Sequence, residues 1–297
     1  MPIHELAALV AAASWALTGI VSVTPSRTLG AMGFVRLRMA IVFAGLALAA
    51  TLLGGWTTLS APMVLPILAS GAVGIFIGDT ALFATMNRLG PRATGVLFAA
   101  NAPIAALLGW LVLGETLVGL AVGGVALSFA GVLLAVAYGR RSDDGANWLE
   151  AVRGPLWIGV ATGLLAATAQ AVGTLLARPV MAAGADPIAV SALRCAIAAL
   201  ALQGLAFVSP TARLAAPLTG RLIAITAFSG FLAMGVGMTL LLFALEGGKV
   251  GIVSTLSATT PVMILPLLWW VTGRAPARTA WVGAALTVAG AALIFAR

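Results

Sequence analysis

Ten apolar runs follow one another along this chain, separated only by short connections. Each holds about 20 residues, the length that an α-helix needs to cross the hydrocarbon core of a bilayer. Only 8% of the residues are charged, against about 25% in typical soluble domains, so the chain cannot cover a surface that faces water. We therefore expect an all-α polytopic membrane protein with ten transmembrane helices. The runs span approximately 4–24, 31–53, 62–87, 93–113, 117–138, 155–177, 187–208, 219–245, 250–271 and 279–296.

The basic residues predict how the chain is oriented. They give a formal net charge of +8, but they lie scattered in short loops and form no stripe, so we expect no nucleic-acid partner. Ten of them fall in the loops after odd-numbered runs, and three fall on the opposite side, which includes both termini. Because Arg and Lys mark cytoplasmic loops, this bias predicts that the termini face outward.

Residues that carry enzymatic chemistry are scarce. Cys195 is the single cysteine and His4 the single histidine, which excludes a disulfide framework and a His/Cys metal cluster. The position of His4 leaves no Ser/His/Asp set, and no glycine-rich loop carries the lysine of a phosphate cradle. The sequence therefore predicts no enzyme, no cofactor and no pumping driven by ATP.

The second half of the chain repeats the first. A polar linker at 139–153 separates a five-helix unit at 1–138 from another at 154–297, and matching residues lie 154–159 positions apart. Because five is an odd number, the second unit is expected to sit upside down in the membrane. Inverted repeats place the substrate site at the midplane between them. Matching pairs include Gly19 with Gly173, Arg38 with Arg194, Gly78 with Gly237, Pro103 with Pro261, and Gly131 with Gly290.

The joint arrangement of several short features on this repeat resembles one known family. The features are Trp15 in the first run, the mid-helix prolines, and Leu-Gly-Glu closing the fourth run at Glu115. They resemble the EamA-type drug/metabolite transporter superfamily along the whole chain, in particular its ten-helix bacterial exporters of amino acids and metabolites. The resemblance implies a carrier of small organic solutes in the bacterial inner (plasma) membrane. Two features depart from the family: Arg274 replaces the second acid, and family members commonly keep both termini in the cytoplasm.

Asp79 is the one acid deep within an apolar run. An ionisable group inside a membrane is by default functional, and Asp79 as a proton-coupling or cation-binding carboxylate is one interpretation. The other is a structural ion pair with Arg38, because both residues lie at similar depth from the same side, at about 1.5 Å per residue. We favour the ion pair. The repeat counterpart of Asp79 is Met238, so its role is not shared by the second half.

The middle thirds of the runs also supply candidates for a solute pocket. Uncharged polar groups are often simple contacts between helices, but groups that converge beside aromatic rings suit a binding pocket. The residues that we expect to bind substrate are Ser14, Trp15, Thr18, Asp79, Phe98, Asn101, Gln170, Thr174, Thr259 and Thr260. We expect the predicted helices 1, 3, 4, 6, 8 and 9 to enclose them, with helices 5 and 10 as outer braces.

Two prolines and one acid complete the set of candidates. Pro103 and Pro261 lie near the centres of their runs, where a missing backbone N–H kinks a helix, so they are candidate gates or ordinary kinks. Glu115 is expected to cap the following helix, because a carboxylate stabilises the free N–H groups at a helix N-terminus.

These features together predict a membrane carrier of small organic metabolites. Amino-acid export by alternating access is the favoured function, because a mixed polar and aromatic pocket suits zwitterions. Alternatives are a sugar or cationic-drug carrier of the same family, or an ungated channel. The expected partners are the lipid bilayer and a small-molecule substrate, with possible proton coupling.

Overall fold

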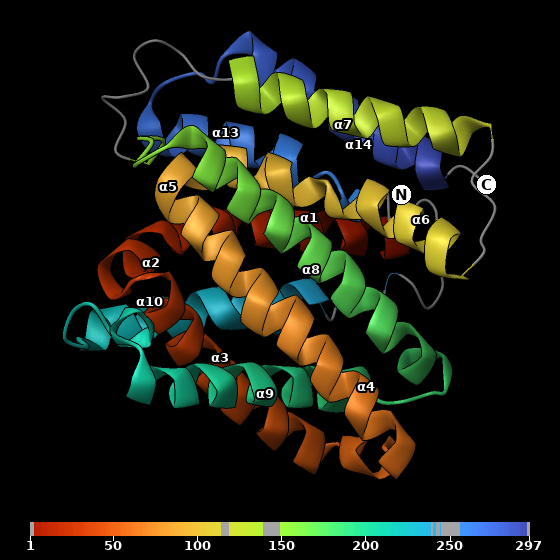
Figure 1. Cartoon of the computed structure of the whole chain (residues 1–297), viewed down its shortest axis with the longest axis vertical. Helices are drawn as coiled ribbons and strands as arrows, with labels where there is room; N and C mark the ends of the chain where they lie inside the picture. Colours follow the sequence, from red (N-terminus) through yellow and green to blue (C-terminus); the bar gives the residue numbers. More distant parts are fainter. Residues whose placement is uncertain are drawn as a thin grey trace.

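All regular structure in the described part of the chain is helical. The computed structural model describes residues 3–113, 119–138, 149–238, 240–241, 244 and 256–295, and no strand occurs within them. The predicted all-α class is therefore confirmed. In chain order the elements are α1 (Ile3–Val21), α2 (Val23–Leu29), α3 (Ala31–Leu52), η1 (Gly55–Thr58), α4 (Ala61–Gly71), η2 (Ala72–Ile77), α5 (Gly78–Ala99), α6 (Asn101–Leu113), α7 (Leu120–Tyr138), α8 (Leu156–Ala182), α9 (Pro187–Val208), η4 (Pro210–Ala212), α10 (Gly220–Gly230), η5 (Phe231–Met238), α13 (Thr260–Thr272) and α14 (Arg278–Phe295) (Figure 1).

The helices are long and apolar enough to make this a polytopic membrane protein. By length and composition, seven helical stretches within the described residues suffice to cross a bilayer. One of them, Ala61–Val112, turns back on itself at Gly90, whose φ of 80° is a conformation that glycine adopts without strain. Two shorter apolar helices, Thr260–Thr272 and Arg278–Ile294, match the last two predicted runs. Every run predicted from the sequence therefore contains a helix.

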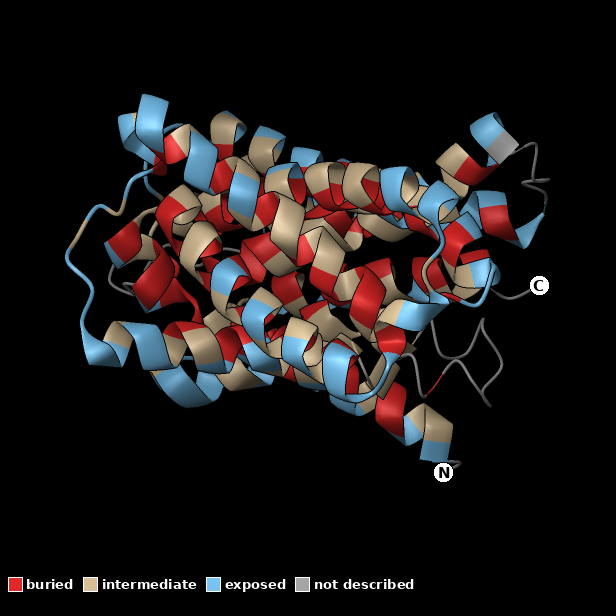
Figure 2. Ribbon diagram, turned by 90° about the horizontal axis from the view of Figure 1, so that it is seen from below, coloured by how far each residue is buried: buried red, intermediate tan, exposed pale blue. Residues whose placement is uncertain are grey.

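Buried residues fill the interior, and exposed residues cover the ends and outer faces (Figure 2). Many large side chains on these outer faces are apolar. Leu52 is 76% exposed, Leu133 69% and Trp270 83%. A soluble protein rarely exposes so much apolar surface, whereas lipid contact requires it. The outer faces therefore suit the acyl chains of a bilayer.

The two halves present the same elements in the same order. In each half a long helix, α3 or α9, is followed by a short 3₁₀ turn, η1 or η4. Next comes a helix, α4 or α10, that continues into a π-helical segment, η2 or η5, and these segments begin at Ala72 and Phe231. The packing crosses between the halves, because α1 packs on η5 and α8 packs on η2. The two halves are thus interleaved rather than separate domains.

Helices α7 and α14 lie along each other at one edge of the bundle, opposite α3 and α9 (Figure 1). Gly124 faces Gly290, and Gly131 faces Gly283, so the two helices run antiparallel. Small residues at matched positions let the helix backbones approach closely. The hydroxyl of Ser128 donates to the carbonyl oxygen of Thr287 (3.2 Å) and closes the contact between the two glycine pairs.

The glycine contact of α7 with α14 predicts that the same Gly→Ala change has different effects on stability at two adjacent positions. A Cβ on Gly124 would lie 2.6 Å from the carbonyl oxygen of Gly290, whereas one on Gly123 meets nothing within 4 Å. Gly124→Ala should lower the free energy of unfolding by about 1–3 kcal/mol relative to Gly123→Ala, as overpacking does. Both changes bring the same gain in helix propensity, so thermal unfolding of the two variants in detergent isolates the clash. Equal stabilities would contradict this packing.

Candidate functional site

Arg38 and Asp79 form an ion pair inside the bundle. Arg38 extends from α3, Asp79 lies in the first turn of α5, and Nη1 of Arg38 is 3.3 Å from Oδ2 of Asp79. Nη2 of Arg38 also donates to the carbonyl oxygen of Ser229 (3.4 Å), and the guanidinium carbon lies 5.2 Å from the centroid of the Phe83 ring. Both charged side chains are buried. The pairing predicted from their depth is thus present, and it also links α3 to the second half of the chain.

Arg194 is the repeat counterpart of Arg38, but it has no such partner. It lies on α9, and the residue that corresponds to Asp79 in the second half is the uncharged Met238. Within the described part of the chain the side chain of Arg194 makes no hydrogen bond or ion pair, and its Nε, like that of Arg38, is buried without a partner. One arginine of the symmetry-related pair therefore has a direct acid partner, whereas the other has only the more distant electrostatic influence of the same Asp79.

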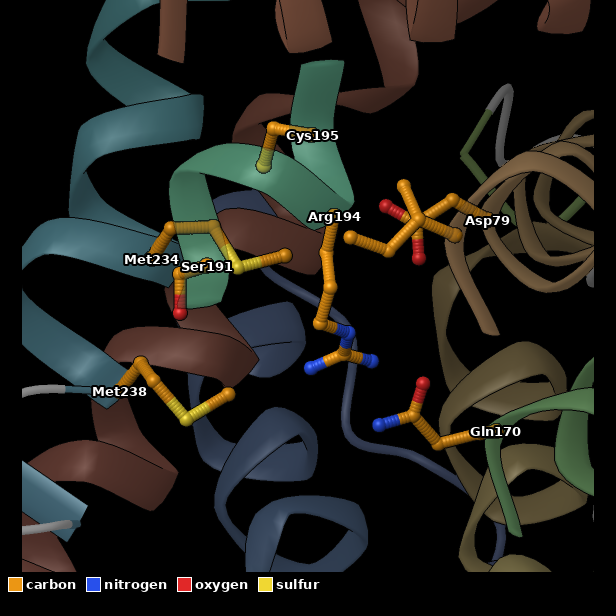
Figure 3. A pocket seen from close by; sticks show the side chains of 8 residues that line it. Asp79, Gln170, Ser191, Arg194, Cys195, Met234 and Met238 are labelled. Carbon is orange, nitrogen blue, oxygen red and sulfur yellow. The ribbon is translucent and has the colours of Figure 1, made fainter. Parts of the chain in front are cut away.

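Arg194 extends into a small cavity between the two halves. The cavity volume is about 20 Å³, room for about one water molecule. Its walls come from η2 and α5 of the first half and from α8, α9 and η5 of the second. Figure 3 shows the guanidinium of Arg194 pointing toward the side-chain amide of Gln170. The lining residues are Ile75, Asp79, Gln170, Ser191, Arg194, Cys195, Met234 and Met238.

Glycines bring the walls of the cavity together. A Cβ on Gly173 of α8 would lie 2.7 Å from the Cα of Gly74, so Gly173 has no space for a side chain. The hydroxyl of Ser70 donates to the carbonyl oxygen of Gly173 (2.6 Å) and fixes this contact. A Cβ on Gly74 would also lie 3.1 Å from Nη2 of Arg194, so Gly74 makes room for the guanidinium. Gly74 lies in the π-helical segment η2, and π-helical turns often occur at functional sites.

The structure brings only part of the predicted pocket to this cavity. Asp79 and Gln170 line it, but the remaining predicted binding residues do not. Most of their polar groups are occupied by helix backbone: the indole N–H of Trp15 donates to Ala233 O (3.0 Å), and the hydroxyl of Thr260 donates to Ser257 O (3.2 Å). The predicted residues outside the cavity walls are Ser14, Trp15, Thr18, Phe98, Asn101, Thr174, Thr259 and Thr260.

The two predicted kink prolines lie at helix starts rather than inside continuous helices. A turn at Ala100 separates α5 from α6, and Pro103 is in the first turn of α6. Likewise a turn ends at Thr259, and Pro261 follows in the first turn of α13. The missing N–H of proline costs little in a first turn, since that group has no helical acceptor there. The predicted breaks are therefore real, and both halves share them.

Six lining residues were absent from the predicted pocket, and three of them lie on α9. They are Ser191, Arg194 and Cys195 on α9, with Ile75, Met234 and Met238. The helix at 187–208 was not expected to form a wall. A signal for Arg194 was nevertheless present in the repeat, where it matches Arg38 while Met238 replaces the acid. The predicted cap residue Glu115 lies outside the described residues.

A second buried ion pair lies toward the end of the bundle where the linker enters. Nε of Arg92 is 3.0 Å from Oε2 of Glu150, and the backbone N–H of Arg92 donates to Oε1 of the same carboxylate (3.2 Å). Arg92 also donates to the carbonyl oxygen of Ala135 on α7 (3.1 Å). The end of the linker is thus bound to the turn at Gly90 and to the α7–α14 pair.

Apolar helices, two interleaved halves and a small cavity between them that is lined by charged and apolar side chains define a polytopic membrane protein of the solute-transporter class. The chain belongs to the EamA-like transporter family, whose sequence profile matches residues 3–137 and 157–296, the two halves in turn. Sixteen chains of solved structures match. One, titled only "Crystal structure of protein", has a TM-score of 0.69 and 20% identity, covering 98% of this chain and 95% of the other, so it shares the fold. No curated protein sequence matches.

The buried pair of Arg38 and Asp79 predicts a coupled loss of stability. Asp79→Asn leaves Arg38 buried without a counterion and should lower the free energy of unfolding by about 3–5 kcal/mol. The double change with Arg38→Gln should recover part of that loss, since the uncompensated charge is then gone. Thermal unfolding of the purified variants measures both effects. Unchanged stability in Asp79→Asn, together with lost proton dependence of transport, would instead make Asp79 a coupling site.

Proposed function

We propose that this protein is a carrier that exports small organic metabolites, amino acids first among them, by alternating access. The observation that carries the proposal is the enclosed cavity between the two halves, which contains charged side chains and is lined by both halves. Ionisable groups inside a membrane are costly and are retained where a solute or ion passes. Transport sites in repeat-built carriers lie at such an interface between halves.

The packing of repeat-related helices supports an inverted arrangement of two five-helix units, 1–138 and 154–297. Helices α7 and α14 occupy matching positions in the two units, and they run antiparallel along each other. The exchanged contacts of α1 with η5 and of α8 with η2 follow the same symmetry. A chain built in this way has two related conformations, in which the units exchange their shapes and the cavity opens to opposite sides.

The small volume of the cavity supports a carrier rather than an ungated channel. The cavity volume of about 20 Å³ is far smaller than that of a typical ligand pocket, which is on the order of 300–1,000 Å³. The cavity walls must therefore move apart before an amino acid can bind. A carrier passes through such a closed state, whereas an ungated channel keeps a continuous path. In this state the contacts of Arg92 with Glu150 bind the end of the linker to the turn at Gly90.

The location and coupling of the carrier complete the proposal. The likeness to bacterial exporters supports a bacterial inner membrane, and the arginine bias supports termini on the outside. Both ends of the chain lie at the same end of the bundle in Figure 1. Asp79 is the acid that lines the cavity in the described residues, so it is the group through which proton coupling would act. Its ion pair with Arg38 means that such coupling requires the pair to separate during the cycle.

Counterflow in proteoliposomes tests the proposal. Uptake of radiolabelled amino acids should saturate and should accelerate when unlabelled amino acid is present on the opposite side. Gln170→Ala should reduce this flux about tenfold, which corresponds to about 1.4 kcal/mol of lost interaction. Gln203→Ala is the matched control, since Gln203 is exposed on the outer side of α9 and should retain wild-type flux. Flux that neither saturates nor shows counterflow would identify a channel.

A further inference from the structure

We infer that Arg194 is the residue that recognises the carboxylate of the transported solute. The inference rests on the proposed transport function and narrows its substrate to compounds that carry a carboxylate, with or without an amino group. The guanidinium of Arg194 enters the cavity together with the amide of Gln170 and the hydroxyl of Ser191. These groups all donate hydrogen bonds, which an anionic oxygen accepts.

The two halves differ in whether their repeat-related arginine has a bonded acid. Arg38 and Arg194 occupy equivalent positions on α3 and α9, and each reaches across a glycine of the opposite half, Gly230 or Gly74. Arg38 meets Asp79, but Met238 stands where a second acid would be. A purely structural use of the two arginines would supply both with acids. The two arginines therefore share one acid, Asp79, which contacts Arg38 and lines the cavity together with Arg194.

The surroundings of Arg194 offer its guanidinium few hydrogen-bond acceptors. The carboxylate of Asp79 lies 3.3 Å from Arg38, and the other lining residues of the cavity are uncharged. Nε of Arg194 is buried without a hydrogen-bond partner. The planar guanidinium donates two parallel hydrogen bonds to a carboxylate, a geometry that lysine cannot reproduce. A bound carboxylate therefore supplies hydrogen-bond acceptors that the side chain of Arg194 lacks among the described residues.

The position of Arg194 has a cost in folding stability. Arg194 is half-buried and has no directly bonded acid, an arrangement that costs stability and persists where function requires it. Substitution by Met is therefore expected to affect stability differently at Arg38 and at Arg194. Arg38→Met breaks the ion pair and leaves Asp79 without its bonded partner, whereas Arg194→Met breaks no hydrogen bond or ion pair among the described residues.

Ligand binding to the purified full-length protein tests the inference. The standard amino acids, several sugars and several cationic drugs are screened by thermal shift, and each amino acid that binds is compared with its amide and its decarboxylated amine. We expect a free carboxylate to be required. Arg194→Gln should weaken binding at least tenfold, and Arg194→Lys should restore part of it. Arg221→Gln, at an exposed position on α10, is the control and should bind as the wild type does.

The possible outcomes separate the inference from the function on which it rests. Equal binding of an amino acid and its amide, or binding of sugars or amines alone, overturns the role of Arg194 and leaves a small-solute carrier. Absence of binding by every compound in the screen overturns both.

Stability without ligand gives a second, independent readout. Arg194→Met should raise the melting temperature or leave it unchanged, while Arg38→Met should lower it by several degrees. If the melting temperature of Arg194→Met falls as far as that of Arg38→Met, Arg194 has a structural role and the inference is overturned.

Discussion

A bilayer offers no water to a buried charge, and this constraint decides how the interior of the protein is arranged. Each ionisable group in the helices must be paired within the protein or face a cavity. Arg38 and Asp79 meet the first condition, through a contact that also reaches Ser229 of the second half. Arg194 meets the second, because its guanidinium borders the enclosed cavity. The position of the candidate site follows from this difference.

Small residues determine how the helices can surround such a site. The contact of Gly74 with Gly173 brings α8 against η2 and leaves space for Arg194, and the glycines of α7 and α14 lock the outer edge of the bundle. Without a hydrophobic driving force between helices in lipid, close backbone packing supplies much of the association. The glycines thus make a narrow, closable cavity possible between two halves that share contacts along their length.

The sequence was sufficient for the fold and for part of the site. Run lengths predicted the helices because the thickness of the bilayer fixes them, and equal depth from one side predicted the contact of Arg38 with Asp79. The pocket was harder, because composition does not determine how each helix is rotated about its axis. Trp15 illustrates this, since its indole N–H bonds to the carbonyl oxygen of Ala233 rather than facing the cavity. Arg194 was missed because its repeat partner already had a structural explanation.

The central claim is that the cavity opens alternately to the two sides of the membrane, and Cys195 reports on it directly. It is the single cysteine of the chain, and it lines the cavity, so no engineered cysteine is needed. Labelling with a membrane-impermeant methanethiosulfonate is measured from each side of proteoliposomes of uniform orientation, with Cys195→Ala as the blank. The account predicts labelling from either side, with rates that an amino acid gradient shifts in opposite directions. Labelling from one side alone, whatever solute is present, would contradict it.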